Sequence, residues 1–504
     1  MGVKISKKFV GDVTTKLLKA SDGGGKLDVS DPDAVGQYVC SVLALCCELI
    51  PGVGSTLSAF TTLLGGLLFK SNSVEKIWVK LRERIEELID SKIEQARIDI
   101  LDQKVRGLQD NMENYQRVLQ DFEDSSGDEK ERSRETLKAT HIAFLSVVRA
   151  AVPEFQVKRF AVPSLPLFAL AANIHLLLLS DGIKRGKAWG YSEKNINTMR
   201  TEFKKKTKPQ DIMDSANDIV AEQRSMLQAA IAIAIDLEMP SKLIETWKSA
   251  HADLVASDSV TVASEDNYND IDYIAYANDI YLQGRQQVKP YSPELDLPED
   301  SNRGAKSAAK LRAYADYDSS MVMNVLSYTS FWPYLDGSEM PEVALKGADR
   351  EIFFGPYGRY TDYAKWSDTR TAPITDRGPP ITSAYLRGSG NVDGLQMKYG
   401  NSWGQAFGST QAGLPNQLDL GKDEYFYWVS VWYGHKLGKV RFWNNKDVSI
   451  ENGNCANGPH GNHAAPPGYA LSSVHITNWE SFTPRGCEGI ILGFRPICFE
   501  FTPN

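Results

Sequence analysis

The chain has 504 residues, a formal net charge of −8 and a hydrophobic fraction of 42%. Because this length exceeds what one hydrophobic core usually serves, we expect two or three domains. The hydrophobic fraction excludes wholesale disorder, and the acidic balance excludes a broad surface for nucleic acid.

The N-terminal residues 1–36 contain Gly23-Gly24-Gly25 and Asp31-Pro32-Asp33 and show little periodicity, which predicts a flexible leader. The first six residues carry charge without a following apolar stretch, so we expect no secretory signal peptide and synthesis in the cytosol. They also fit the loose pattern for N-terminal myristoylation, which leaves lipidation open.

The six cysteines are too few for a disulfide framework in a chain of this length. Those at positions 40, 46 and 47 lie in an apolar segment and are interpreted as small hydrophobic residues. Cys455, Cys487 and Cys498 leave one bridge possible, and the sequence does not decide whether it forms.

Residues 37–335 carry mainly helical patterns. The apolar segment 43–69 is interrupted at Pro51, which favours two short helices over one membrane span. Apolar residues spaced by three or four from Ile77 to Leu119 predict one long amphipathic helix, and the charged residues 121–134 predict an exposed loop open to proteases. A second amphipathic helix follows and ends at Pro153.

Residues 165–179 are apolar on every face except at Asn173 and His175. Ser164 is placed as the N-cap, with Pro166 in the first turn of the helix. Fifteen residues are short for a permanent membrane span, so we expect the central helix of a bundle. His175 is interpreted as a core imidazole that bonds to a neighbouring group.

Further helical patterns start at Ser192 and cover residues 226–237, 243–254, 271–282 and 306–331. Residues 287–304 are rich in Pro, Asp, Glu and Ser and predict a surface excursion, and Trp332-Pro333 closes the helical region. Residues 336–504 contain short alternating runs with Gly, Pro and aromatic residues, which predict an all-β domain. Three of these runs repeat weakly, which suits three sheets packed as a prism.

The order of these elements resembles the N-terminal bundle of the Cry-type (crystal) insecticidal δ-endotoxins. The segment 50–54 resembles the early helical hairpin of that family, residues 85–93 its third helix, and residues 165–189 its central fifth helix and the start of the sixth. Residues 321–334 and 349–352 are similar to its seventh helix and the first strand of its second domain.

The C-terminal part resembles the β-prism shared by jacalin-related lectins, vitelline-membrane-type proteins and the second domain of the toxin family. The resemblance therefore implies a multidomain α and β protein with a helical bundle at 37–335 and a β-prism-like domain at 336–504. Residues 223–304 are longer than the usual connection, and no residues remain for the family's third domain, so we expect that domain to be lacking.

The resemblance implies an insecticidal pore-forming toxin that binds a receptor on gut epithelial cells, oligomerises and inserts the hairpin 134–179 into the membrane. The implied membrane-inserting helix includes Leu165, Leu170, Asn173, His175, Leu177 and Leu179. The candidate pore-lining residues, on the polar face of the preceding helix, are Glu135, Lys138, Ser146 and Arg149. The candidate receptor-binding residues, in expected turns, are Asn401, Trp403, His435, Lys436, Asn444 and Asn445.

Signals for catalysis are poor, so we expect no enzyme, no cofactor and no metal site. Gly23-Gly24-Gly25-Lys26 lacks the spacing of a phosphate-binding loop, and no pair of carboxylates stands out as catalytic. Residues 489–493 lack the aspartate of a jacalin-type sugar site. The expected partners are a target-cell membrane, a membrane glycoprotein or glycan receptor and further copies of the chain, with no nucleic acid, and the expected place of action is the target membrane after ingestion or release.

Two other functions stay open. The first is a carbohydrate-binding defence or storage lectin without pore activity, in which the helical part serves only assembly. The second is an intracellular cell-death executor that uses the same bundle.

Overall fold

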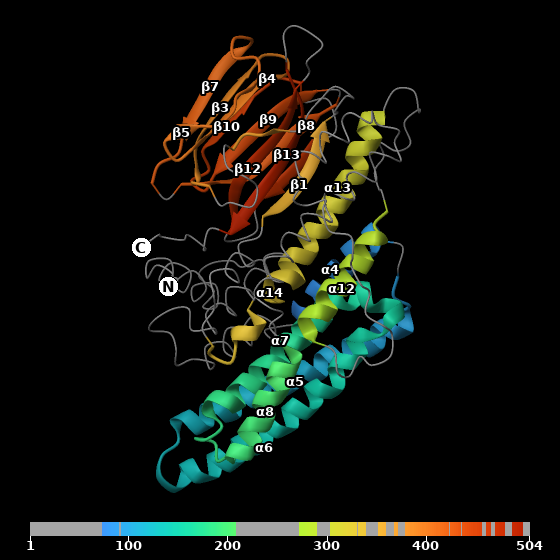
Figure 1. Ribbon diagram of the computed structural model, residues 1–504, viewed down its shortest axis with the longest axis vertical. Helices are drawn as coiled ribbons and strands as arrows, with labels where there is room; N and C mark the ends of the chain where they lie inside the picture. Colours follow the sequence, from blue (N-terminus) through green and yellow to red (C-terminus); the bar gives the residue numbers. More distant parts are fainter. Residues whose placement is uncertain are drawn as a thin grey trace.

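The computed structural model describes residues 73–89, 92–207, 272–289, 303–329, 331–338, 351–358, 367–370, 378–422, 424–434, 436–455, 460–464, 469–478 and 486–496. Helices form an elongated bundle, and strands form a separate sheet-rich part beside one end of it (Figure 1). The expected combination of an N-terminal helical domain and a sheet-rich C-terminal region is confirmed. The expected leader 1–36, the break at Pro51, the helices at 226–237 and 243–254 and most of the excursion at 287–304 lie outside the described residues.

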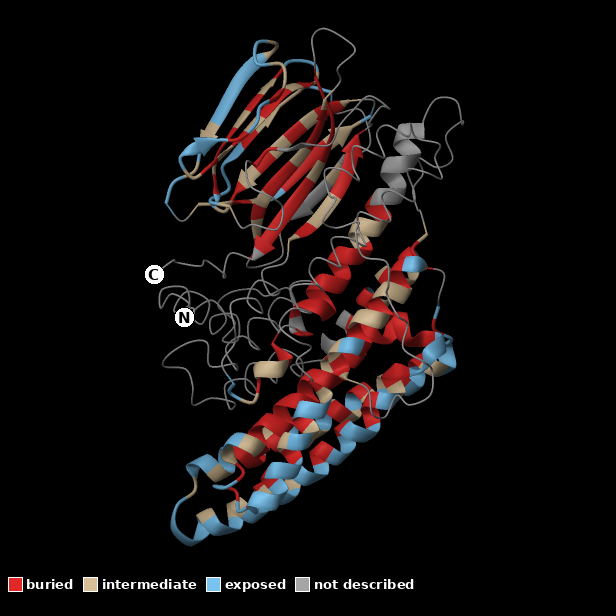
Figure 2. Ribbon diagram, viewed as in Figure 1, coloured by how far each residue is buried: buried red, intermediate tan, exposed pale blue. Residues whose placement is uncertain are grey.

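The described helical elements follow the chain order. They are α4 (Ser73–Leu88), α5 (Gln95–Asp124), α6 (Gly127–Ala151), η1 (Val152–Gln156), η2 (Lys158–Phe160), α7 (Ala161–Arg185), α8 (Glu193–Lys206), α12 (Tyr273–Gln286), α13 (Arg303–Met321), the π-helical η6 (Val322–Leu326), α14 (Ser327–Thr329) and η7 (Trp332–Tyr334). Their apolar stripes face inward and their charged stripes face solvent, as Figure 2 shows for α5, α6 and α8.

The long helix expected from Ile77 to Leu119 is two helices, α4 and α5. Between them, Ile89 forms an isolated β-bridge with Val288, and the Lys289 amide donates to the Leu88 carbonyl at 2.8 Å. The Ile93 amide donates to Glu86 Oε1 instead of an i−4 carbonyl. These bonds replace the helical ladder, so the break is a tertiary effect that the apolar period does not reveal.

The prediction of a loop at 121–134 is also wrong. Helix α5 runs to Asp124, two residues intervene, and α6 starts at Gly127, which has a φ of 59°. Glycine is suited to this corner because the left-handed region costs it nothing. Most of residues 121–134 is exposed, so the charge density reflects a solvated hairpin tip rather than a loop.

Helix α7 begins three residues before the expected N-cap and extends beyond the expected end, to Arg185. Ser164 is therefore a buried residue of the first turns and not a cap. Pro166 lies inside the helix, where its missing N–H leaves the carbonyl four residues earlier without the usual donor. The predicted helix start at Ser192 is confirmed, since its side chain accepts from the Asn195 amide at 3.2 Å.

Within the described residues the strands form three antiparallel sheets, ordered β1-β13-β12-β2, β10-β9-β8-β11 and β5-β4-β3-β7, with β6 paired to β4. Apolar side chains of each sheet, such as Leu386, Val429 and Leu492, are fully buried and belong to the core. The strands are β1 (Ile352–Gly358), β2 (Ser367–Asp368), β3 (Ile381–Gly388), β4 (Val392–Tyr399), β5 (Ser402–Trp403), β6 (Phe407–Gly408), β7 (Leu414–Asp419), β8 (Phe426–Tyr433), β9 (Leu437–Asn444), β10 (Ser449–Asn452), β11 (His460–Ala464), β12 (Tyr469–Asn478) and β13 (Cys487–Pro496).

The helical and sheet-rich parts are joined where α13 packs along β1 (Figure 1). Arg312 Nη1 donates to the Pro356 carbonyl at 2.8 Å, and Ser319 Oγ donates to the Phe353 carbonyl at the same distance. Since α13 is also packed in the bundle, it ties the position of the sheets to that of the helices. In the described part of the chain, Cys455 is exposed, Cys487 is buried in β13, and both thiols are free.

The buried central helix as candidate functional site

Helix α7 lies in the interior of the bundle, with α4, α6, α8 and α12 packed around it. Leu165, Leu177 and Leu179 are buried, whereas Leu170 is partly buried against the core. Of the described helices, the segment 158–185 is the one long and apolar enough to cross a membrane, with a mean hydropathy of 1.8, and 94% of its most apolar window is buried. The helix therefore has the composition of a membrane span and the surroundings of a protein core.

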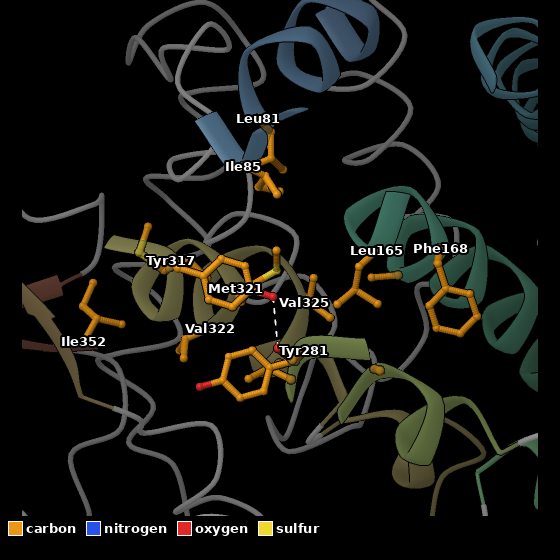
Figure 3. Packing of buried hydrophobic residues seen from close by; sticks show 14 of the residues in the cluster. Leu81, Ile85, Leu165, Phe168, Tyr281, Tyr317, Met321, Val322, Val325 and Ile352 are labelled. Carbon is orange, nitrogen blue, oxygen red and sulfur yellow. Dashed lines mark hydrogen bonds between the residues drawn. The ribbon is translucent and has the colours of Figure 1, made fainter. Parts of the chain in front are cut away.

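Residues of α4, α7, α12 and α13 meet in one apolar cluster that continues to β1 (Figure 3). Leu165 and Phe168 extend from α7 into this cluster, where the Tyr317 hydroxyl donates to the Tyr281 carbonyl at 3.0 Å. The labelled members are Leu81, Ile85, Leu165, Phe168, Tyr281, Tyr317, Met321, Val322, Val325 and Ile352. The N-terminal half of α7 is thus held by packing against apolar side chains of α4, α12 and α13.

The polar side chains of α7 are bonded to elements that surround it. Asn173 Oδ1 accepts from the indole Nε1 of Trp332, in η7. Ser180 Oγ donates to the Leu335 carbonyl, directly after η7. Because an unpaired polar group in a core costs free energy, these bonds tie α7 to the end of the helical region.

His175 links four helices. Its Nδ1 lies 2.7 Å from the hydroxyl of Tyr273 in α12, and its Nε2 lies 3.3 Å from Oε1 of Glu202 in α8. The same Glu202 oxygen accepts from Nε of Arg149 in α6 at 2.8 Å, and the second oxygen accepts from the Arg149 Nη2. The expected core histidine bonded to neighbouring groups is observed.

The charge of Glu202 is set by this environment. Burial alone would raise the pKa of the carboxyl, but the adjacent His175 and the Arg149 guanidinium outweigh it and lower the pKa to about 2. Glu202 is therefore ionised at neutral pH.

Asp181 forms another bond at the C-terminal end of α7. Its Oδ2 accepts from the hydroxyl of Tyr115, in α5, at 2.9 Å. Burial raises the pKa of Asp181 to about 7, against the opposing effects of the Arg185 charge and of the Tyr115 bond. A carboxyl that should be charged in water is thus close to half-protonated at neutral pH.

His141 of α6 joins α6 to α7 and to the turn that follows α7. His141 Nε2 lies 2.8 Å from the Leu178 carbonyl, and Nδ1 lies 2.8 Å from the Tyr191 hydroxyl. His141 is fully buried and fixes the register of the two helices.

The candidate pore-lining residues share the outer face of α6. Glu135, Ser146 and Arg149 are exposed, and the half-buried Lys138 donates to the Gly190 carbonyl at 3.0 Å. Their placement on the solvent face agrees with the amphipathic pattern.

The candidate receptor-binding residues do not form one site. Asn401 and Trp403 are exposed at the turn into β5. Lys436 and Asn445 are half-buried in other turns.

Two further candidates differ from the expectation. Asn444 is buried, and its Oδ1 accepts from the amides of Lys446 and Val448, so the expectation that it faces a receptor is corrected. Its side chain shapes the β9–β10 turn instead. His435 lies outside the described residues.

Sequence reasoning identified Asn173 and His175 but missed their partners Glu202, Tyr273 and Trp332. It assigned no role to Asp181, although a charged residue two positions after the predicted apolar segment 165–179 was a usable signal. Among the described residues no group of three or more His, Cys, Asp or Glu side chains is placed to hold a metal ion.

Comparison with known proteins shows what part of this chain is similar to. Residues 42–217 match the delta endotoxin, N-terminal domain. Pesticidal crystal protein Cry1Id of Bacillus thuringiensis is 34% identical over 149 residues, which are 30% of this chain and 20% of that protein. The chain thus aligns with about a fifth of the length of this curated relative.

Solved structures show the same fold over most of the chain. The Bacillus thuringiensis insecticidal crystal protein Cry7Ca1 has a TM-score of 0.59 at 15% identity, covering 93% of this chain and 76% of that one. The crystal structure of PirB has a TM-score of 0.54 at 12% identity, covering 92% of this chain and 94% of that one.

Proposed function

We propose that the protein is an insecticidal pore-forming toxin, because residues 42–217 match the delta endotoxin N-terminal domain and the chain shares the fold of the crystal protein Cry7Ca1. It engages a receptor on gut epithelial cells through its sheet-rich part, oligomerises and inserts the hairpin 134–179 into the membrane. The observation that carries the proposal is the burial of α7, a helix of membrane-spanning length and composition, inside a shell of amphipathic helices.

Insertion separates the hairpin from the rest of the bundle. Polar contacts within the hairpin can therefore persist, whereas contacts between the hairpin and other elements must break. The contact of His141 with the Leu178 carbonyl lies within the hairpin and persists. The contacts of Asn173, His175 and Arg149 reach elements outside it and must break. In the bilayer, sister copies or water replace these partners, since an unpaired polar group in hydrocarbon is costly.

The two hairpin helices then take different environments. Helix α7 faces lipid or neighbouring copies, because its surface is almost wholly apolar. Glu135, Lys138, Ser146 and Arg149 of α6 line a water-filled lumen, which is the one place in a membrane where charged groups remain hydrated. The turns of the sheet-rich part that hold Asn401, Trp403, His435, Lys436 and Asn445 contribute to receptor contact.

Dye release from liposomes tests the insertion step with Leu170→Asp. Leu170 is only partly buried in the water-soluble form, so a carboxylate is tolerated there, yet it lies within the inserting helix. A charge at the bilayer centre costs about 3 kcal/mol on insertion scales, so we expect about a hundredfold less inserted protein.

The matched control is Ile100→Asp, on α5. Ile100 is 41% exposed and lies outside the hairpin, so the same chemical change should leave dye release intact. Equal release by Leu170→Asp and the wild type would contradict insertion of α7. A protein that binds glycans and releases no dye before or after protease treatment would support the lectin alternative instead.

Feeding insect larvae gives the organismal result. The Leu177→Asp variant, altered at a position that is 3% exposed, perturbs the core as well as the inserting face, so its folding is verified first. Killing by that variant equal to killing by the wild type would contradict the proposal. Toxicity seen only on expression in the cytosol would favour the cell-death executor.

A further inference from the structure

The outer face of the sheet β10-β9-β8-β11 carries an unusual set of side chains, which we call the indole face. Alternation along β8 and β9 turns Val429, Val431 and Phe442 into the core. The residues that alternate with them lie on the opposite side of the sheet and define the indole face: Trp428, the buried Ser430, Trp432, Lys439, Arg441, Trp443 and, from β10, Glu451.

The tryptophans occupy both ends of this face. Trp428 pairs across the strands with Trp443, with ring centroids 6.3 Å apart, and Trp432 pairs with Lys439. Trp432 lies four positions after Trp428 in β8, which is a rise of about 13 Å along the strand. Trp428 is 38% exposed, which is a large apolar surface for a strand position that faces solvent.

Charged groups occupy the space between the indoles. Lys439 Nζ lies 3.0 Å from Glu451 Oε1, and Arg441 donates to Glu451 Oε2 through Nε and Nη2. The Lys439 ammonium also lies 5.4 Å from the Trp432 ring centroid, and the Arg441 guanidinium lies 5.2 Å from that of Trp443. These contacts hold the side chains of the face in place, and the face carries both hydrogen-bond donors and acceptors.

The chemistry of the face distinguishes between possible occupants. A phosphate or an acidic lipid headgroup only accepts hydrogen bonds, so it would be repelled by Glu451, which both basic groups already share. A protein interface core is depleted of Lys and Glu, which occupy the centre here. Hydroxyl groups both donate and accept, and the apolar face of a pyranose ring stacks on an indole, so an uncharged sugar chain satisfies every feature.

We infer that the indole face binds a neutral oligosaccharide in an extended conformation, with sugar rings on the indoles of Trp428 and Trp432 and hydroxyls on Arg441 and Glu451. This inference rests on the proposed function and names the class of receptor group that the sheet-rich part recognises. The site is distinct from the turn residues proposed above, because it lies on the body of a sheet.

The test measures binding of the full chain to immobilised chitohexaose, cellohexaose, mannohexaose and lacto-N-tetraose by biolayer interferometry. We expect at least one of these neutral glycans to bind, and Trp428→Ala to weaken binding about tenfold or more. Trp428→Phe keeps a stacking ring and should retain most of the affinity, which separates loss of stacking from loss of fold. Leu414→Ala, at a position that is 74% exposed on β7, is the surface control and should bind as the wild type does.

A second variant, Glu451→Gln, tests the charge argument. It removes the acceptor that both basic groups share, so neutral glycans should bind about fivefold more weakly, while binding to phosphatidylserine vesicles should increase. Absence of binding to all four glycans, or equal binding by Trp428→Ala and the wild type, would overturn the inference. So would tighter binding of the wild type to phosphatidylserine vesicles than to any neutral glycan.

The outcomes separate this inference from the proposed function. Trp428→Ala should release dye from receptor-free liposomes as the wild type does, because the inserting hairpin is unchanged. Dye release without glycan binding refutes the inference alone. Glycan binding without dye release by the wild type refutes the pore-forming proposal and leaves the inference as a property of a lectin.

Discussion

Asp181→Asn should make the bundle more stable at alkaline pH and leave it unchanged at acidic pH. The change is nearly isosteric, and the asparagine oxygen can still accept from the Tyr115 hydroxyl, as Asp181 does at 2.9 Å. A protonated aspartate and an asparagine both present one acceptor and a donor, so the two proteins are chemically alike wherever Asp181 is protonated.

The magnitude follows from the displaced pKa of Asp181. Burial raises it from 3.8 to about 7 in the folded protein, so folding takes up a proton. The stability that this group contributes is complete below the unfolded value and is lost as the pH rises through 7. The folded and unfolded pKa values differ by about 3 units, and at 1.36 kcal/mol per unit the free energy of unfolding falls by about 4 kcal/mol. Water that enters beside the ionised carboxylate reduces this loss to about 2–4 kcal/mol.

The assay is denaturant unfolding of both proteins between pH 4 and pH 9, with their secondary structure compared beforehand. The free energy of unfolding of the wild type should fall relative to that of Asp181→Asn from about pH 4 upward and level off above about pH 8. The control is Asp110→Asn, at an exposed position of α5, which should follow the wild type throughout. If the wild type and Asp181→Asn lost the same stability on going to pH 9, the buried carboxyl would not be the cause.

Three further predictions concern the contacts around α7. Glu202→Gln removes the ion pair with the partly exposed Arg149 and should lower the free energy of unfolding by about 1 kcal/mol at neutral pH, with faster dye release from liposomes. The adjacent His175 and Arg149 hold the pKa of Glu202 at about 2, below its ordinary value of 4.5, so its contribution is complete above pH 4.5 and is lost as the pH falls toward 2. The unfolding midpoints of the wild type and Glu202→Gln should therefore converge in acid, and a constant difference would exclude this carboxylate as the source. Gly284→Ala would place a Cβ 1.9 Å from the Tyr317 hydroxyl and should cost about 2 kcal/mol or more, whereas an unchanged unfolding midpoint would show that α12 can move away.

The sequence was sufficient for helices whose structure is determined locally. The apolar stripe of α6, the helix start at Ser192 and the turn-rich alternation of the strands each depend on residues within a few positions of one another. The break between α4 and α5 could not be predicted in this way, because it depends on a bridge between Ile89 and Val288, far apart in the chain. The pairing order of the strands is non-local for the same reason.

The candidate site was predictable in part. Asn173 and His175 stand out because they are polar within an apolar helix, which indicates that partners must exist. Which residues supply those partners depends on packing, since Trp332 is 159 residues from Asn173 and Tyr273 is 98 residues from His175. A single sequence shows the need for a partner and not its identity.

The division between apolar and polar contacts explains how one helix can serve two environments. The leucines of α7 lose little on exchanging protein for lipid, because acyl chains are as apolar as leucine side chains. Its polar contacts cannot be exchanged so cheaply, because those of Asn173 and His175 reach Trp332, Tyr273 and Glu202, all outside the hairpin. In the proposed insertion, the barrier therefore lies mainly in a few directional bonds rather than in the large apolar interface. We propose that the trigger of insertion acts on those bonds.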